Sequence, residues 1–167
     1  MERRNFLAAS GLGIIAVGGP ISWLLVQSSK TDMGASARHF EENILSENTS
    51  RGNEILDYKE TNTKIITSAA RAGNNLISKK GVGEFVDNTD FASSYLVLIQ
   101  NGMSSEMTLA LDSISREEDS IHFDVSVEPP ETNYAPDNVA THSLLVRIGN
   151  KEGGIPQSVS LDIEGYV

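Results

Sequence analysis

The chain contains no cysteine. Disulfide bonds, thiolate metal sites, a cysteine nucleophile and a lipid attached through cysteine are therefore excluded. A domain without disulfides must be held together by burial, and a β-sandwich of about 100 residues can achieve this. Hydrophobic residues make up 39% of the 167 residues, which is enough for a core, so we do not expect wholesale disorder.

Basic residues are scarce, with 13 against 23 acidic residues and a net charge of −10. The first 37 residues hold three basic and two acidic residues, so the remainder holds 10 basic and 21 acidic residues. Such a body repels phosphate backbones, and its longest basic run is Lys79-Lys80, so we expect no nucleic-acid partner. The acidity indicates either ordinary solubility or a surface adapted to high salt.

Familiar catalytic motifs are also lacking. No serine lies in a Gly-x-Ser-x-Gly elbow, and Gly81-Val82-Gly83 is not followed by the Lys-Ser/Thr of a nucleotide loop. The acidic turn Glu117-Glu118-Asp119 is too short to supply the roughly six oxygens of a specific Ca²⁺ site. We therefore predict no enzyme, no catalytic residues, no metal site and no cofactor.

One long apolar run is present, near the N-terminus. Residues 6–26 are predominantly apolar, follow Arg3-Arg4, and give way to polar residues at Gln27. A basic start, an apolar run and a polar boundary are typical of a segment threaded into a membrane. A run of about 20 residues also matches the hydrocarbon thickness as a helix, so we expect a hydrophobic signal or anchor helix here.

The start of this run resembles the twin-arginine translocation motif, two arginines followed by any residue and then Phe-Leu. The matching residues are Arg3, Arg4, Phe6 and Leu7. The match covers this core and not its flanks, where Glu2 and Ala8 replace the residues that are usual. The resemblance implies that the twin-arginine translocase exports the body already folded. Such signals are read by a receptor rather than by hydrophobicity alone.

Ala35-Ser36-Ala37 has the small-x-small form that signal peptidase accepts, with Ala35 and Ala37 as its small residues. It lies about nine residues beyond the apolar run, farther than is usual. Cleavage would give a secreted protein, and retention, which we favour, would give a membrane-anchored one. In both cases the arginine pair keeps the N-terminus in the cytoplasm and places residues 38–167 on the external side.

The chain is expected to have three parts. Residues 1–37 are the signal or anchor, residues 38–63 a polar spacer, and residues 64–167 a β-rich extracytoplasmic domain. The spacer contains an N-glycosylation acceptor triplet at Asn48-Thr49-Ser50, with Asn48 as the modified residue. Its end holds a possible first strand near residues 54–58.

Hydrophobic periodicity predicts the elements of the domain. A short strand at 64–67 is followed by one helix at 68–78, and the pattern then changes to alternation. Five further strands are expected at 94–100, 107–111, 121–127, 144–148 and 159–167, with Asn101-Gly102 as a turn. This spacing predicts a mainly β fold, a small antiparallel β-sandwich or open barrel with the helix covering one end.

The stretches 89–100 (TDFASSYLVLIQ) and 141–148 (THSLLVRI) resemble a group of small exported β-domain proteins of halophilic archaea, most of them uncharacterised. More faintly, the strand order resembles the protease-complex B-type β-domain of bacterial envelope proteins. The resemblance covers about residues 65–167 and implies an exported envelope domain without catalytic residues. Members usually carry a lipid-attachment cysteine after the leader, which this chain lacks.

Two functional hypotheses follow. The first is a cell-envelope β-domain with a binding or structural role, whose partners are the membrane, the translocase and an unknown envelope or surface protein. The alternative is an exported metal-dependent hydrolase that uses His122, Asp124 and His142. His122 and Asp124 are two residues apart on a predicted strand, hence on one face, where such a pair can hold a metal.

Overall fold

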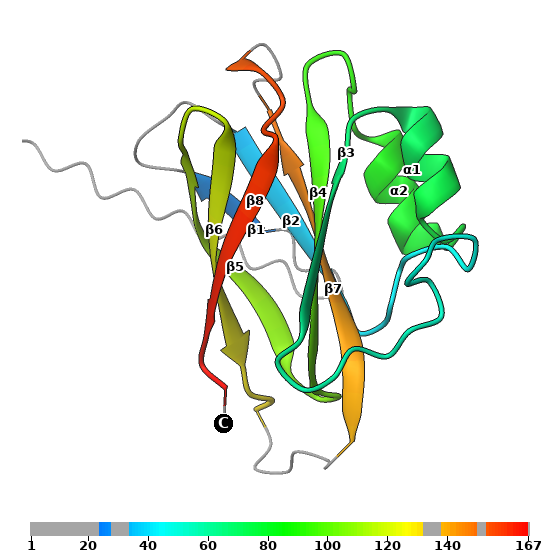
Figure 1. Cartoon of the computed structure of the whole chain (residues 1–167), viewed down its shortest axis with the longest axis vertical. Helices are drawn as coiled ribbons and strands as arrows, with labels where there is room; N and C mark the ends of the chain where they lie inside the picture. Colours follow the sequence, from blue (N-terminus) through cyan, green and yellow to red (C-terminus); the bar gives the residue numbers. More distant parts are fainter. Residues whose placement is uncertain (1–23, 28–33, 132–137, 150–152, 167) are drawn as a thin grey trace, which may run out of the picture.

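The computed structural model describes residues 24–27, 34–131, 138–149 and 153–166. In this part of the chain two β-sheets pack face to face, and two short helices lie against the outer face of the larger sheet (Figure 1). The prediction of a mainly β fold is confirmed. Both sheets are open, so the fold is a sandwich-like arrangement rather than a barrel.

The larger sheet has five antiparallel strands in the order β1-β2-β7-β4-β3. Their bounds are β1 Leu24–Gln27, β2 Gly34–Phe40, β3 Thr61–Ile66, β4 Tyr95–Ser104 and β7 Val139–Ile148. The strands β4 and β7 lie next to each other near the middle and pair over ten residues each. Because both of their faces are covered, these two strands are buried over most of their length, and β4 begins with the apolar run that the sequence predicts for a central strand.

The smaller sheet has three strands in the order β5-β6-β8, with bounds β5 Thr108–Arg116, β6 Ser120–Glu128 and β8 Ser158–Glu164. An antiparallel hairpin joins β5 to β6, and β8 lies parallel to β6. The chain leaves this sheet after β6, adds β7 to the larger sheet, and then returns. The expectation of a purely antiparallel fold is therefore wrong for β8.

The predicted helix at 68–78 corresponds to α1 Ala69–Asn75, and a second helix, α2 Lys80–Asp87, was not predicted. Ser68 caps α1 by accepting a hydrogen bond from the backbone N–H of Arg71. The helix ends at Leu76, which instead forms a β-bridge with Leu45. The two helices cover a face of the larger sheet and not an end of the domain as predicted, because Val82 and α2's other buried residues pack against the sheet.

Two hydrophobic cores result. The first lies between the sheets and is built from alternating residues of both, including Tyr95, Val97, Ile99, Phe123, Val125, Leu144 and Val146. The second lies between the larger sheet and the helices and includes Ile44, Leu45, Ile66, Ala72, Leu76, Phe85, Leu96, Leu98 and Leu145. The larger sheet is thus the middle layer of three.

Residues 38–63, expected as a polar spacer, are integrated into the domain. Ile44, Leu45 and Leu56 are buried in this segment, and its first residues complete β2. The polar side chain of Asn43 holds the segment in place by donating to the backbone carbonyls of Arg51 and Glu54. No strand forms at 54–58, where the backbone is a loop and turn.

Asn101-Gly102 is not a turn, because β4 continues through both residues to Ser104. The glycine serves a close approach between backbones: a Cβ at Gly102 would lie 2.0 Å from the carbonyl oxygen of Asp57. The backbone of Gly102 also exchanges hydrogen bonds with Lys59 and Glu60 of that loop. A glycine that permits close packing and one that permits a turn look the same in the sequence.

Candidate functional site

The outer face of the smaller sheet brings three possible metal ligands together. His122 and Asp124 lie on β6, and Asp162 lies beside them on β8. His122 Nε2 is 3.2 Å from Asp124 Oδ1 and 3.5 Å from Asp162 Oδ2. One ligand atom from each of the three side chains lies within 4.8 Å of the others.

Strand alternation and register produce this cluster. On β6 the residues Ile121, Phe123 and Val125 are buried between the sheets, so His122 and Asp124 face outward. The parallel register with β8 then aligns His122 with Ser160 and Asp124 with Asp162. Four polar residues therefore lie close together on the solvent-facing surface of the smaller sheet.

Two serines hold the cluster's side chains. Ser160 Oγ lies 2.8 Å from His122 Nδ1, and Ser113 of β5 donates a hydrogen bond to Asp124 Oδ2. The pKa of Asp124 is lowered, mainly by the hydrogen bond from Ser113 and further by His122. Asp124 is therefore a carboxylate at neutral pH, with its second oxygen directed at the imidazole.

Sequence reasoning named His122 and Asp124 only in the alternative hypothesis and missed Asp162. The pair was visible because both residues lie on one strand, whereas Asp162 reaches the site only through the parallel pairing of β8 with β6. Alternation on the last strand does mark Asp162 as an outward residue. The missing information was which strand lies beside which.

The third residue of the alternative hydrolase hypothesis, His142, lies elsewhere. It belongs to β7 in the larger sheet, is fully buried, and shares the inward-facing parity of Leu144. Its partner is His39 of β2, whose Nε2 lies 3.0 Å from His142 Nδ1. The structure therefore brings His122 and Asp124 together and does not bring His142 to them.

The two imidazole rings of His39 and His142 lie edge to edge in one plane, with an interplanar angle of 5° and centroids 5.2 Å apart. This is the geometry of a hydrogen bond between neutral imidazoles, one donating and one accepting. Burial, and then the neighbouring His142, lower the pKa of His39 to about 4. Burial also lowers the pKa of His142. The pair is uncharged at neutral pH.

The residues of the export motif, Arg3, Arg4, Phe6 and Leu7, lie outside the described part of the chain. The last residues of the apolar run, 24–26, belong to β1, which pairs with β2, and the rest of the run lies outside the described residues. Among the described residues, no helix is both long and apolar enough to span a membrane.

The possible cleavage residues lie inside the fold. Ala35 and Ala37 are buried in β2, a strand that pairs with β1 on one side and β7 on the other. The possible glycosylation residue Asn48 is exposed in a turn of the loop that follows β2. Its position is accessible to a modifying enzyme.

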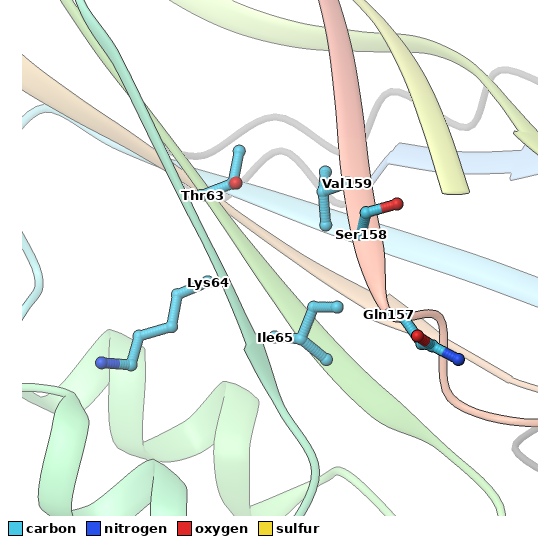
Figure 2. A pocket seen from close by; sticks show the side chains of 6 residues that line it. All are labelled: Thr63, Lys64, Ile65, Gln157, Ser158 and Val159. Atoms are coloured by element: carbon cyan, nitrogen blue, oxygen red, sulfur yellow. The ribbon is translucent and has the colours of Figure 1, made fainter. Parts of the chain in front are cut away.

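A shallow open hollow of about 320 Å³ lies where the two sheets part, between the edge strands β3 and β8. Its lining residues are Thr63, Lys64, Ile65, Gln157, Ser158 and Val159. Figure 2 shows the side chains of Thr63 and Ile65 on the side of β3 that faces β8, and Lys64 on the opposite side. We call this border between β3 and β8 the seam.

At the seam each sheet ends, since no described strand pairs with the outer edge of β3 or of β8. The opposite border differs, because there β5 contacts β1 and β2 of the larger sheet. Apolar residues beside the seam are only partly buried, namely Ile65, Val159, Leu161 and Ile163. The seam therefore combines unpaired strand edges with incompletely covered apolar side chains.

Comparison of the chain with protein-family models, with curated proteins and with solved structures gives no match.

Proposed function

We propose that the protein is an exported, membrane-tethered domain of the cell envelope that binds an extended segment of a partner polypeptide and catalyses no reaction. The export part rests on the sequence, in which the twin-arginine core at Arg3 and Arg4 precedes an apolar run. The membrane, the translocase and an envelope protein are the partners of this proposal.

The position of β2 supports tethering over cleavage at Ala35-Ser36-Ala37. Cleavage after Ala37 would remove the first half of β2, including two buried alanines and their pairing with Val146 and Ile148 of β7. A body that folds before export would hold this segment in a sheet, where a peptidase that needs an extended substrate has no access. Retention of the apolar segment leaves the domain at the membrane surface.

The observation that carries the binding role is the seam. An exposed strand edge offers a row of backbone N–H and C=O groups to which another chain can add as a strand. The seam has two such edges, one from each sheet, with a hollow between them. A strand added there would satisfy the backbone groups and cover Ile65 and Val159 with its alternate side chains.

The negative charge of the domain indicates which residues the partner segment carries. Residues 38–167 carry 10 basic and 21 acidic residues, and β8 presents Asp162 and Glu164 outward beside the seam. A segment with basic residues on its exposed face would be attracted, and an acidic one would be repelled. We therefore propose an extended segment that alternates apolar and basic residues.

Site-specific photo-crosslinking in cells tests this proposal. A photoreactive residue at Ser158, in the seam, is compared with one at Ser126, on the outward face of β6. We expect a defined adduct with an envelope protein from position 158 and none from position 126. Mass spectrometry should place the crosslink in an extended segment of the partner with alternating apolar and basic residues.

Thr63→Lys is the variant designed to block strand addition at the seam. It places a charge on the side of β3 that faces β8, and inward-pointing charges protect edges against strand addition. The adduct from position 158 should fall strongly while the melting temperature stays near that of the parent. Equal adducts from positions 158 and 126, or an adduct that Thr63→Lys leaves unchanged, would refute strand binding at the seam.

A further inference from the structure

We infer that His122, Asp124 and Asp162 form a binding site for a single divalent transition-metal ion of the Zn²⁺ type, held on the outer face of the smaller sheet. One imidazole nitrogen and two carboxylate oxygens are a donor set that Zn²⁺ accepts, and three protein ligands leave a position for water. The site is distinct from the seam, although both use β8.

The distances fit one ion. Two ligand atoms each about 2.1 Å from a tetrahedral Zn²⁺ lie about 3.4 Å apart. The observed separations from His122 Nε2 are 3.2 Å to Asp124 and 3.5 Å to Asp162. The third separation, between the two carboxylates, is at most 4.8 Å, which a small side-chain rotation closes. An ion can therefore enter without a change in the backbone.

The electrostatics also favour a cation. Asp124 and Asp162 are direct cross-strand neighbours, and like charges placed opposite each other destabilise a sheet. In the described part of the chain the only ion-pair partner of either carboxylate is His122. A divalent ion between the three side chains would replace this repulsion with attraction to both aspartates.

Hydrogen bonds with two serines orient the ligands. A proton on His122 Nδ1 can be donated to Ser160 Oγ at 2.8 Å, which leaves the lone pair of Nε2 free for the metal. Ser113 holds one oxygen of Asp124, so the other oxygen, Oδ1, is the one directed at the imidazole. Each β6 ligand is thus oriented by a serine of a neighbouring strand.

The exposure of the site indicates its role. The side chains are 27% exposed for His122, 48% for Asp124 and 75% for Asp162, so a bound ion would be open to solvent. The ligands come from two strands that are far apart in the sequence and adjacent in the sheet. A bound ion would join β8, the last strand, to β6 and so stabilise the edge that forms one wall of the seam.

Titration of the full chain in detergent with ZnCl₂, followed by calorimetry and by thermal melting, tests the inference. We expect one ion per chain and a higher melting temperature with Zn²⁺. His122→Gln and Asp162→Asn should each abolish binding or weaken it at least tenfold. Ser160→Ala removes the hydroxyl that contacts His122 Nδ1 and should weaken binding about tenfold, within the range known for residues that hydrogen-bond a metal ligand.

Glu164→Gln is the matched control, since it removes one charge from the same face of the same strand two residues beyond Asp162. It should bind Zn²⁺ as the parent does. Asp162→Asn is exposed and isosteric, and its metal-free melting temperature shows whether it is folded. The inference fails if the parent binds no Zn²⁺, if both ligand variants bind as tightly as the parent, or if His39→Gln is the substitution that abolishes binding.

Discussion

The two sheets of this domain differ in how many of their faces are covered. The larger sheet is the middle layer, so nine of the ten residues of β4 are buried. The smaller sheet covers the larger one on one side and faces solvent on the other, so β6 alternates between buried and partly exposed residues. Coverage, and not strand length, explains why the first reads as an apolar run and the second as a strict alternation.

The same contrast decides what polar residues do. In the larger sheet several of them form a buried hydrogen-bond network, in which the amide of Gln100 donates to Asn43 and Ser143 and accepts from Asn62. These contacts fix the loop after β2 to the sheet. On the smaller sheet the outward polar residues are accessible, and there they form the candidate metal site. Polar side chains are accessible for binding on the face of the smaller sheet that is not packed against the larger sheet.

The largest loss of stability is expected from a substitution that disrupts the packing between the sheets. Phe123 is fully buried in the inter-sheet core. Phe123→Ala should lower the free energy of unfolding by about 3–5 kcal/mol, the cost of lost apolar burial and of the cavity that remains. Denaturant unfolding of the full chain measures this difference.

Ile55→Ala is the control for that prediction, because Ile55 is 71% exposed. A surface substitution of this kind should change the free energy of unfolding by less than about 0.5 kcal/mol. Similar losses at both positions would mean that the two sheets do not pack as a single core.

The second prediction concerns the buried histidine pair of the larger sheet. The pKa of His39 is about 4 in the folded protein and near 6.5 when unfolded, so the unfolded state binds more protons between these values. Stability should therefore fall as the pH drops from 6.5 to about 4, by about 2–3 kcal/mol from His39. Asp124, whose pKa is already lowered, loses its contribution only below this window.

His39→Gln isolates this contribution, since glutamine can still hydrogen-bond His142 and cannot be protonated. Chemical denaturation at several pH values should show a flatter dependence between pH 6.5 and 4 for the variant than for the parent. Parallel curves for the two proteins would show that His39 is not held uncharged in the fold.

Alternation along the chain was enough to predict β6 and β8 closely, because the buried and exposed faces of a half-buried strand give alternating apolar and polar residues. The apolar run of β4 was found as well, but not its end. Asn101 and Gly102 have the residue types of a hairpin turn, and only the approach of the 56–60 loop shows that Gly102 serves close packing within a strand.

Pairing between distant segments could not be predicted. Residues 38–63 contain many charged residues, and their three buried side chains, Ile44, Leu45 and Leu56, are too widely spaced to give a period. The candidate metal site was only partly visible for the same reason. His122 and Asp124 lie on one strand, whereas Asp162 joins them through the parallel pairing of β8 with β6, and in the sequence β7 of the other sheet lies between these two strands. Local sequence patterns are thus enough to predict strands, whereas the candidate site depends on which distant strands pair.

The smallest change in stability is expected from salt, because salt acts on the charges of the exposed faces and not on the packing of the buried ones. Residues 38–167 hold 21 acidic and 10 basic residues, so like-charge repulsion opposes compaction wherever screening is weak. The Debye length is about 30 Å in 0.01 M salt and about 3 Å in 1 M salt, so repulsion across the domain is felt in the first and nearly absent in the second.

The melting temperature of the metal-free chain should therefore be lower in 0.01 M NaCl than in 1 M NaCl. Asp162→Asn removes one member of the cross-strand pair with Asp124, a contact worth about 0.2–1 kcal/mol, and should reduce this difference slightly. A surface adapted to hypersaline surroundings would continue to gain stability above 1 M, where screening is already saturated. A melting temperature that does not change from 0.01 M to 1 M would mean that the acidic residues are locally paired or well separated, and it would remove the argument for adaptation to high salt.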